Sequence, residues 1–90
     1  MSIFNLVALK GTQIILTELS EKGEVKYSDL AKAVVHSTTT SRALSQMEKH
    51  GFIKRKVLQA KYRPVIYSLT NRGTQLAELV KSLMELEKHL

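Results

Sequence analysis

The fold is decided by residues 28–50, which read SDLAKAVVHSTTTSRALSQMEKH. The opening serine is a suitable N-cap, so a short helix is predicted over residues 29–34. A polar turn, His36-Ser37-Thr38, separates it from a second helix predicted over residues 38–50. Gly51 follows as a suitable helix terminator. Two short helices joined by a tight turn are typical of a DNA-binding helix-turn-helix.

The second predicted helix has an inward and an outward side. At about 100° per residue, Thr40, Leu44 and Met47 fall on the inward side. The outward side and its flanks carry hydroxyls, two cations and one amide, namely Thr38, Thr39, Arg42, Ser45, Gln46 and Lys49. Arginine can bind guanine O6 and N7, and glutamine can bind adenine N6 and N7.

These side chains are therefore candidates for contact with DNA. We predict base reading by Thr38, Thr39, Arg42, Ser45 and Gln46. Phosphate contacts are predicted for Ser37 and Lys49. The structural alternative is that residues 38–41 only cap a helix, and both roles can hold together because the N-terminal residues of such a helix lie nearest the groove.

The flanking sequence completes one α+β, mostly α domain over residues 1–90. A helix is predicted over residues 11–22 and a short extended stretch over residues 25–27. Strands are predicted over residues 52–58 and 65–69, joined by a loop, with Val65, Tyr67 and Leu69 inward. Thr70 is expected to cap a final helix that runs toward Leu90.

The positive charge of the chain is concentrated in one segment. The formal net charge is +6, and residues 51–73 hold six basic side chains and no acid. The remaining residues hold eight basic and eight acidic side chains, which cancel. A charge run is often only a solvated surface, but an ordinary surface mixes both signs. We therefore predict that the hairpin over residues 54–66, called the wing below, contacts phosphates through Lys54, Lys56, Lys61 and Arg63.

The last predicted helix carries a long apolar stripe. Its leucines and valine follow steps of three and four residues. The first turns could simply cover their own core, but the stripe continues beyond what a domain of this size can cover. Residues 71–90 are therefore predicted to form the dimerisation helix of a two-fold homodimer, joined by the apolar start of the chain. The predicted interface comprises Ile3, Phe4, Val7, Leu79, Val80, Leu83, Leu86 and Leu90.

Several classes of function are disfavoured by the composition. There is no cysteine, and His36, His50 and His89 are scattered, so no metal site or cofactor is predicted. No glycine-rich phosphate loop or nucleophile motif indicates an enzyme. No signal peptide and no apolar run of about 20 residues is present, so a cytoplasmic protein without a membrane partner is expected.

Two binding functions remain as alternatives to sequence-specific DNA binding. The domain could be a protein–protein interaction module, although such a module has no need of six uncompensated cations. It could also be a nonspecific nucleic-acid-binding or architectural protein. RNA binding would favour exposed stacking aromatics, for which Tyr62 is the one candidate.

Three pieces of the chain resemble one group of proteins. They are YSDL at residues 27–30, ALSQMEKHGFI at 43–53 and RPVIYSLTNRG at 63–73. With them the chain resembles, from about residue 9 to 80, the winged-helix transcriptional regulators of the HxlR-type and neighbouring MarR- and ArsR-like groups of prokaryotes and archaea. The resemblance implies a winged helix-turn-helix with a three-helix core.

The same resemblance implies a homodimer on double-stranded DNA with an inverted-repeat site. One recognition helix would enter each half-site, and the wing would lie on the flanking backbone or minor groove. Members of these groups that sense thiol-reactive compounds use a cysteine near the N-terminus, and metal sensors need Cys or His clusters. Neither is present, so sensing of metals or of thiol-reactive compounds is not expected, and the sequence does not identify a small-molecule effector.

Overall fold

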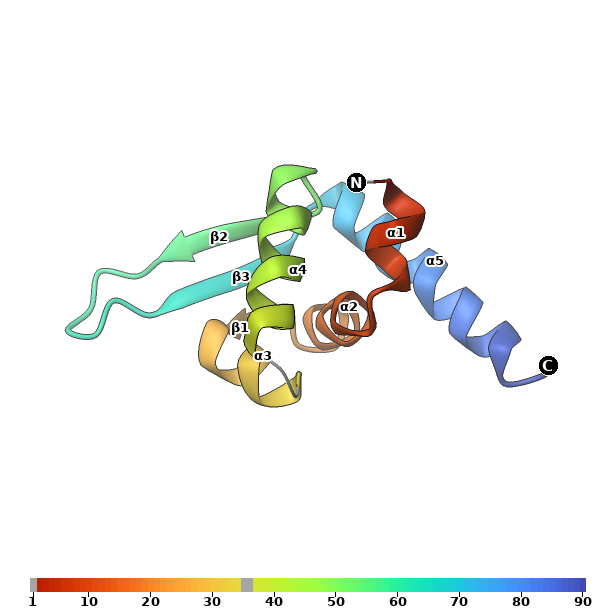
Figure 1. Cartoon of the computed structure of the whole chain (residues 1–90). Helices are drawn as coiled ribbons and strands as arrows, with labels where there is room; N and C mark the ends of the chain where they lie inside the picture. Colours follow the sequence, from red (N-terminus) through yellow and green to blue (C-terminus); the bar gives the residue numbers. More distant parts are fainter. Residues whose placement is uncertain (1, 35–36) are drawn as a thin grey trace.

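The computed structural model describes residues 2–34 and 37–90, except for the side chains of residues 37–39. The elements in chain order are α1 (Ile3–Ala8), α2 (Lys10–Lys22), β1 (Glu24–Lys26), α3 (Tyr27–Ala33), α4 (Ser37–Lys49), β2 (Ile53–Val57), β3 (Val65–Leu69) and α5 (Asn71–Glu87). The β2–β3 hairpin projects from one side of the helices and α5 from the other (Figure 1). The molecule is therefore elongated, with extents of 48 × 27 × 25 Å.

The predicted order of elements is confirmed, with one addition at the start. The apolar opening of the chain forms α1, for which no helix was predicted. The Ser2 hydroxyl caps it by accepting the Asn5 N–H at 3.1 Å. Leu6 is buried in the common core, so this short helix is held by packing as well as by its cap.

The start of α3 differs from the prediction. Ser28 was expected to be its N-cap, but the helix begins at Tyr27 and its N-cap is Lys26, which forms no side-chain capping hydrogen bond. Lys26 is the last residue of β1 and pairs with Ile66 in the sheet. The helix therefore follows the strand without a connecting residue, and the predicted extended stretch shifts to Glu24–Lys26.

The three strands form one antiparallel sheet in the order β1-β3-β2. Across the hairpin, Lys54 pairs with Ser68, Arg55 with Tyr67 and Lys56 with Ile66. Partners in a ladder project from the same face, and successive residues alternate between faces. Arg55 and Tyr67 therefore share one face of the hairpin, whereas Lys54 and Lys56 project from the other.

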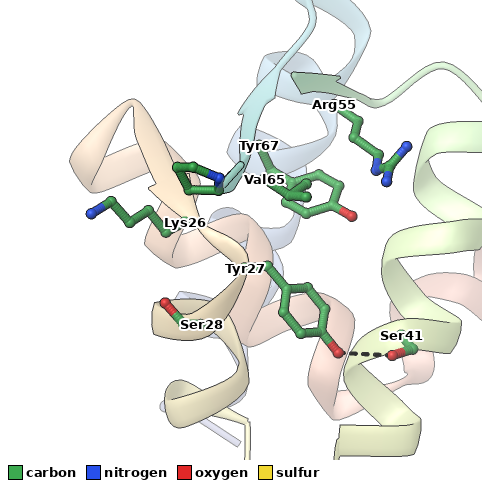
Figure 2. A pocket seen from close by; sticks show the side chains of 8 residues that line it. Lys26, Tyr27, Ser28, Ser41, Arg55, Val65 and Tyr67 are labelled. Carbon is green, nitrogen blue, oxygen red and sulfur yellow. Dashed lines mark hydrogen bonds between the residues drawn. The ribbon is translucent and has the colours of Figure 1, made fainter. Parts of the chain in front are cut away.

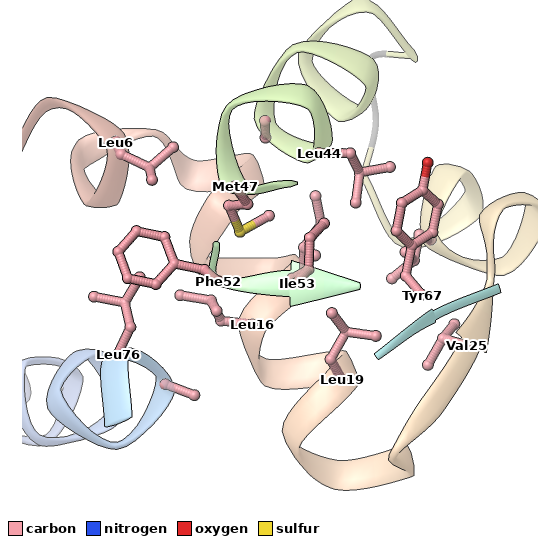
Figure 3. Packing of buried hydrophobic residues seen from close by; sticks show 14 of the residues in the cluster. Leu6, Leu16, Leu19, Val25, Leu44, Met47, Phe52, Ile53, Tyr67 and Leu76 are labelled. Atoms are coloured by element: carbon pink, nitrogen blue, oxygen red, sulfur yellow. The ribbon is translucent and has the colours of Figure 1, made fainter. Parts of the chain in front are cut away.

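The core lies where the helices meet the inner face of the sheet (Figure 3). It takes residues from every element: Leu6, Leu16, Leu19, Val25, Leu30, Leu44, Met47, Ile53, Tyr67 and Leu76 are all buried. Tyr67 is buried and Val65 and Leu69 are half-buried, in line with the predicted inward side of β3. Burial of one such leucine or isoleucine stabilises the fold by about 1.5–3 kcal/mol.

Thr70 joins the end of α4 to the start of α5, and its predicted role as a cap is confirmed. Its hydroxyl accepts the Gly73 N–H at 3.0 Å and donates to the Gly51 carbonyl at 2.6 Å. Its own N–H donates to the Phe52 carbonyl at 3.1 Å. A Cβ at Gly73 would overlap that carbonyl oxygen, so only glycine fits this close approach.

Candidate nucleic-acid interface

The rotation of α4 leaves a polar stripe exposed. Thr40, Leu44 and Met47 are buried, as predicted, together with Ala43. Arg42, Ser45 and Lys49 are exposed on the opposite side of the helix. Gly51 follows with φ of +78°, in the left-handed conformation expected of a helix terminator. The exposed stripe is the surface that a groove of DNA would meet.

The remaining residues predicted on this surface differ in how they are placed. Gln46 is half-buried at the edge of the stripe. The side chains of Ser37, Thr38 and Thr39 lie outside the described part of the structure, as does the whole of the predicted turn residue His36. The described stripe therefore rests on Arg42, Ser45 and Lys49, with Gln46 beside it.

The wing exposes cations on both of its faces. Lys54 and Lys56 are exposed on one face, and Arg55 is exposed on the other. Lys61 and Arg63 are exposed in the loop at the far end (Figure 1). Between them Tyr62 is 86% exposed, with the Lys61 Nζ 5.9 Å from its ring centroid. The whole length of the hairpin thus presents positive charge to an anionic partner.

Arg72, the sixth cation of the basic segment, lies beyond the wing at the start of α5. Its guanidinium carbon lies 5.0 Å from the centroid of the Phe52 ring. This distance fits a cation–π contact, which fixes the side chain against the body of the protein. Five of the six cations therefore belong to the hairpin itself.

A cavity of about 410 Å³ opens between the start of α3, α4 and the base of the wing (Figure 2). We call it the wing-base cavity. Its lining includes Lys26, Tyr27, Ser41, Arg55, Val65 and Tyr67. The Tyr27 and Ser41 hydroxyl oxygens lie 2.9 Å apart and form a hydrogen bond between α3 and α4.

The polar residues of this cavity were not among the predicted DNA-binding residues. Ser41 was grouped with the residues that cap the helix, Tyr27 was assigned to a strand, and Arg55 was counted only as a charge. The alternation of residues along residues 52–58 was the available signal, because it separates Arg55 from its two lysine neighbours.

The charge of Arg55 acts on the Tyr67 hydroxyl at the back of the cavity. Burial raises the pKa of the Tyr67 hydroxyl, and the positive charge of Arg55 partly offsets that rise. Tyr67 therefore stays neutral near pH 7 and retains its hydroxyl proton. The Arg55 guanidinium extends toward α4 (Figure 2).

A second exposed surface is apolar and lies on α5. Leu79, Leu83 and Leu86 are 63%, 58% and 67% exposed, and Leu90 after the helix is exposed as well. Ile3 and Phe4 of α1 are also exposed, and Val7 is half-buried. Val80 was predicted to lie in the same interface, but it is 4% exposed and packs in the core of its own chain.

In residues 2–34 and 37–90, no helix is both long and apolar enough to cross a membrane. Within the same described ranges, no three histidine or acidic side chains come together as a metal site.

A short helix, a second helix with an exposed polar stripe and then a basic two-stranded hairpin define a winged helix-turn-helix protein. The three-helix core, the hairpin and the long C-terminal helix agree with the predicted fold class. The chain belongs to the HxlR-like helix-turn-helix family, whose model matches residues 6–90. It is a DNA-binding transcriptional regulator and not an enzyme, as the sequence predicted.

Solved structures share this fold over nearly the whole chain. A candidate transcriptional regulator, ytfH from Salmonella typhimurium, is 26% identical with a TM-score of 0.85, covering 96% of this chain and 78% of that one. A candidate MarR-family regulator from Porphyromonas gingivalis W83 is 21% identical with a TM-score of 0.81, covering 94% and 84%. The reduced form of the transcriptional regulator YodB from B. subtilis is 21% identical with a TM-score of 0.76, covering 91% and 81%. Comparison with curated proteins gave no match.

Proposed function

We propose that this regulator binds specific sequences of double-stranded DNA in the cytoplasm, with α4 in the major groove and the wing on the flanking backbone or minor groove. One observation carries the proposal: the exposed stripe of α4 is polar and belongs to the same domain as a hairpin with five cations and no acid. An α-helix fits the major groove, where each base pair presents a distinct set of donors and acceptors.

Within this proposal, α4 reads bases and the wing provides affinity. Arg42 has the reach and geometry for guanine, and Ser45 and Gln46 supply shorter polar contacts. Thr38 and Thr39 belong to the same proposed base-reading set, and Ser37 and Lys49 to the phosphate-binding set. Lys54, Lys56, Lys61 and Arg63 contact phosphates, which adds affinity for any sequence.

We further propose that the protein acts as a homodimer joined through α5 and α1. The exposed leucines of α5 and the exposed Ile3 and Phe4 form an apolar surface that a second copy would bury. In a two-fold dimer, two α4 helices would lie about one turn of DNA, roughly 34 Å, apart. The preferred site would then be an inverted repeat.

The test is selection of bound fragments from random duplex DNA, carried out with the wild type and with Arg42→Ala. The wild type is expected to enrich an inverted repeat. Arg42→Ala should weaken binding to that repeat by about 1–3 kcal/mol and relax base choice at one position in each half-site. Lys10→Ala is the matched control. It also removes one charge from an exposed residue, but Lys10 lines a pocket formed by α2 and α5 and not by α4 or the wing.

The outcomes separate the proposal from its alternatives. Binding without any enriched sequence would support a nonspecific architectural protein. Absence of DNA binding at low salt would favour a protein–protein interaction module. An Arg42→Ala variant with unchanged affinity and unchanged selected sequence would show that α4 does not read bases through its exposed stripe.

A further inference from the structure

The wing-base cavity gathers hydrogen-bond donors from three separate elements. Tyr27 comes from α3, Ser41 from α4 and Arg55 from β2. Among the lining residues that the structure describes, two are basic and none is acidic. The cavity is also next to the exposed stripe of α4, because Ser41 lies one turn before Ser45 on that helix.

The hydroxyl pair at the cavity has one hydrogen left over. Tyr27 and Ser41 carry two hydroxyl hydrogens between them, and their mutual hydrogen bond uses only one. The other hydrogen needs an acceptor, and Ser41 is exposed, so the acceptor can come from outside the protein. An anionic oxygen is the strongest acceptor for such a hydroxyl.

Arg55 supplies the charge that an anion would require. Its partner across the hairpin is Tyr67, so its side chain projects from the face of the wing that lines the cavity. Figure 2 shows its guanidinium on the side of the cavity toward α4, above the Tyr27–Ser41 pair. A guanidinium offers several N–H donors in one plane, which suits two oxygens of a phosphate.

We propose that the wing-base cavity binds one phosphodiester group of the DNA backbone, held by Arg55 and by the free hydroxyl hydrogen of the Tyr27–Ser41 pair. This inference rests on the proposed function, since it places DNA against α4 and the wing at once. It adds Tyr27, Ser41 and Arg55 to the phosphate-binding residues. The bound phosphate fixes the wing relative to the recognition helix.

Glu48 is an acid of α4 whose charge acts on Tyr67 at the cavity. It is exposed on α4, and repulsion by its negative charge adds to the rise in the pKa of Tyr67 that burial causes. It does not line the cavity. Ser41 lies about two helical turns before Glu48 along α4, which separates the proposed phosphate contact from that carboxylate.

The experiment scans one neutral methylphosphonate along the backbone of the selected DNA site and measures affinity with the wild type and Arg55→Gln. At one position in each half-site, the methylphosphonate should weaken wild-type binding by about tenfold, the usual effect of one lost charge-assisted contact. The same substitution should have little effect on Arg55→Gln, because the partner of that phosphate is already absent. Tyr27→Phe should weaken binding by about threefold to tenfold and couple to the same position.

Lys54→Gln is the matched control, since it removes the same charge one residue away on the opposite face of the wing. It should couple to a different phosphate or to none. The inference is overturned if no backbone position couples to Arg55, or if Lys54 and Arg55 couple equally to the same position. Both results require a wild type that binds its selected site, so they are distinct from failure of the proposed function, in which the wild type selects no site.

Discussion

Replacing Leu83 by glutamate is expected to separate the two subunits of the proposed dimer. Leu83 is 58% exposed on the apolar stripe of α5. Full burial of a leucine stabilises by about 1.5–3 kcal/mol, so covering the exposed part contributes about 1–2 kcal/mol. A two-fold interface contains the residue twice, so its loss costs about 2–4 kcal/mol of dimer stability. Since about 1.4 kcal/mol corresponds to a tenfold change, the dissociation constant of the dimer should rise at least about thirtyfold. Burial of two carboxylates increases the effect further.

Sedimentation equilibrium over a series of protein concentrations measures this change directly. The wild type should sediment as a dimer at micromolar concentration and Leu83→Glu as a 10.2 kDa monomer. Lys81→Gln is the control, because it changes the net charge by the same amount at an exposed residue of α5 outside the stripe. Circular dichroism of both variants checks that the domain is still folded. The monomer should also bind the inverted repeat much more weakly, since the two half-sites are no longer engaged together.

One result would refute the proposed dimer through α5. A wild type that sediments as a monomer over the whole concentration range would show that the leucines of α5 are not covered by a second copy. The proposed inverted repeat would then lose its support as well. A Leu83→Glu variant that remains a dimer would move the interface to another surface of the molecule.

Three further predictions concern the wing, the α4–α5 junction and the charge on α4. Binding should weaken steeply with salt: the logarithm of the binding constant should fall with the logarithm of salt concentration at a slope of about −5 to −7, for a dimer that neutralises three to four phosphates per subunit. The double variant Lys61→Ala, Arg63→Ala should have a shallower slope. An unchanged slope would show that the wing tip does not contact DNA. Gly73→Ala should lower the free energy of unfolding by about 3 kcal/mol, because the alanine Cβ would overlap the Phe52 carbonyl oxygen. A melting temperature within about 2 °C of the wild type would contradict that overlap. Glu48→Gln should tighten DNA binding by up to about fivefold through loss of repulsion, which a titration at low salt measures; weaker binding would mean that the carboxylate orients a cation instead.

Much of the fold could be predicted because its signals are local. The inward side of α4 followed from helical spacing alone, and Thr70 and Gly51 lie where a cap and a terminator were expected. The missed features depend on tertiary contacts. α1 is only six residues long and depends on the burial of Leu6, which no local pattern encodes. The N-cap of α3 was misplaced because strand pairing holds Lys26 in an extended conformation.

The sequence predicted which residue types form the candidate interface, but not which face of the hairpin each side chain occupies. Arg42 and Lys49 were placed outward correctly, since a helix has a known angular step. The wing cations were found by charge, yet charge does not tell which face of a hairpin each one takes. The contact between Tyr27 and Ser41 joins residues 14 positions apart on two different helices, so it became visible only in the folded chain.

Three of the hydrogen bonds of Thr70, those to Gly51, Phe52 and Gly73, have a consequence for the choice of DNA site. They tie the end of α4 to the start of α5, and we expect them to hold the angle between the proposed DNA-reading helix and the helix that would pair the subunits. In the proposed dimer, a stiff corner would pass the geometry of the subunit contact on to the two α4 helices. The regulator would then require a fixed number of base pairs between the half-sites as strictly as it requires their bases. A Thr70→Val protein would tolerate spacers one base pair longer or shorter.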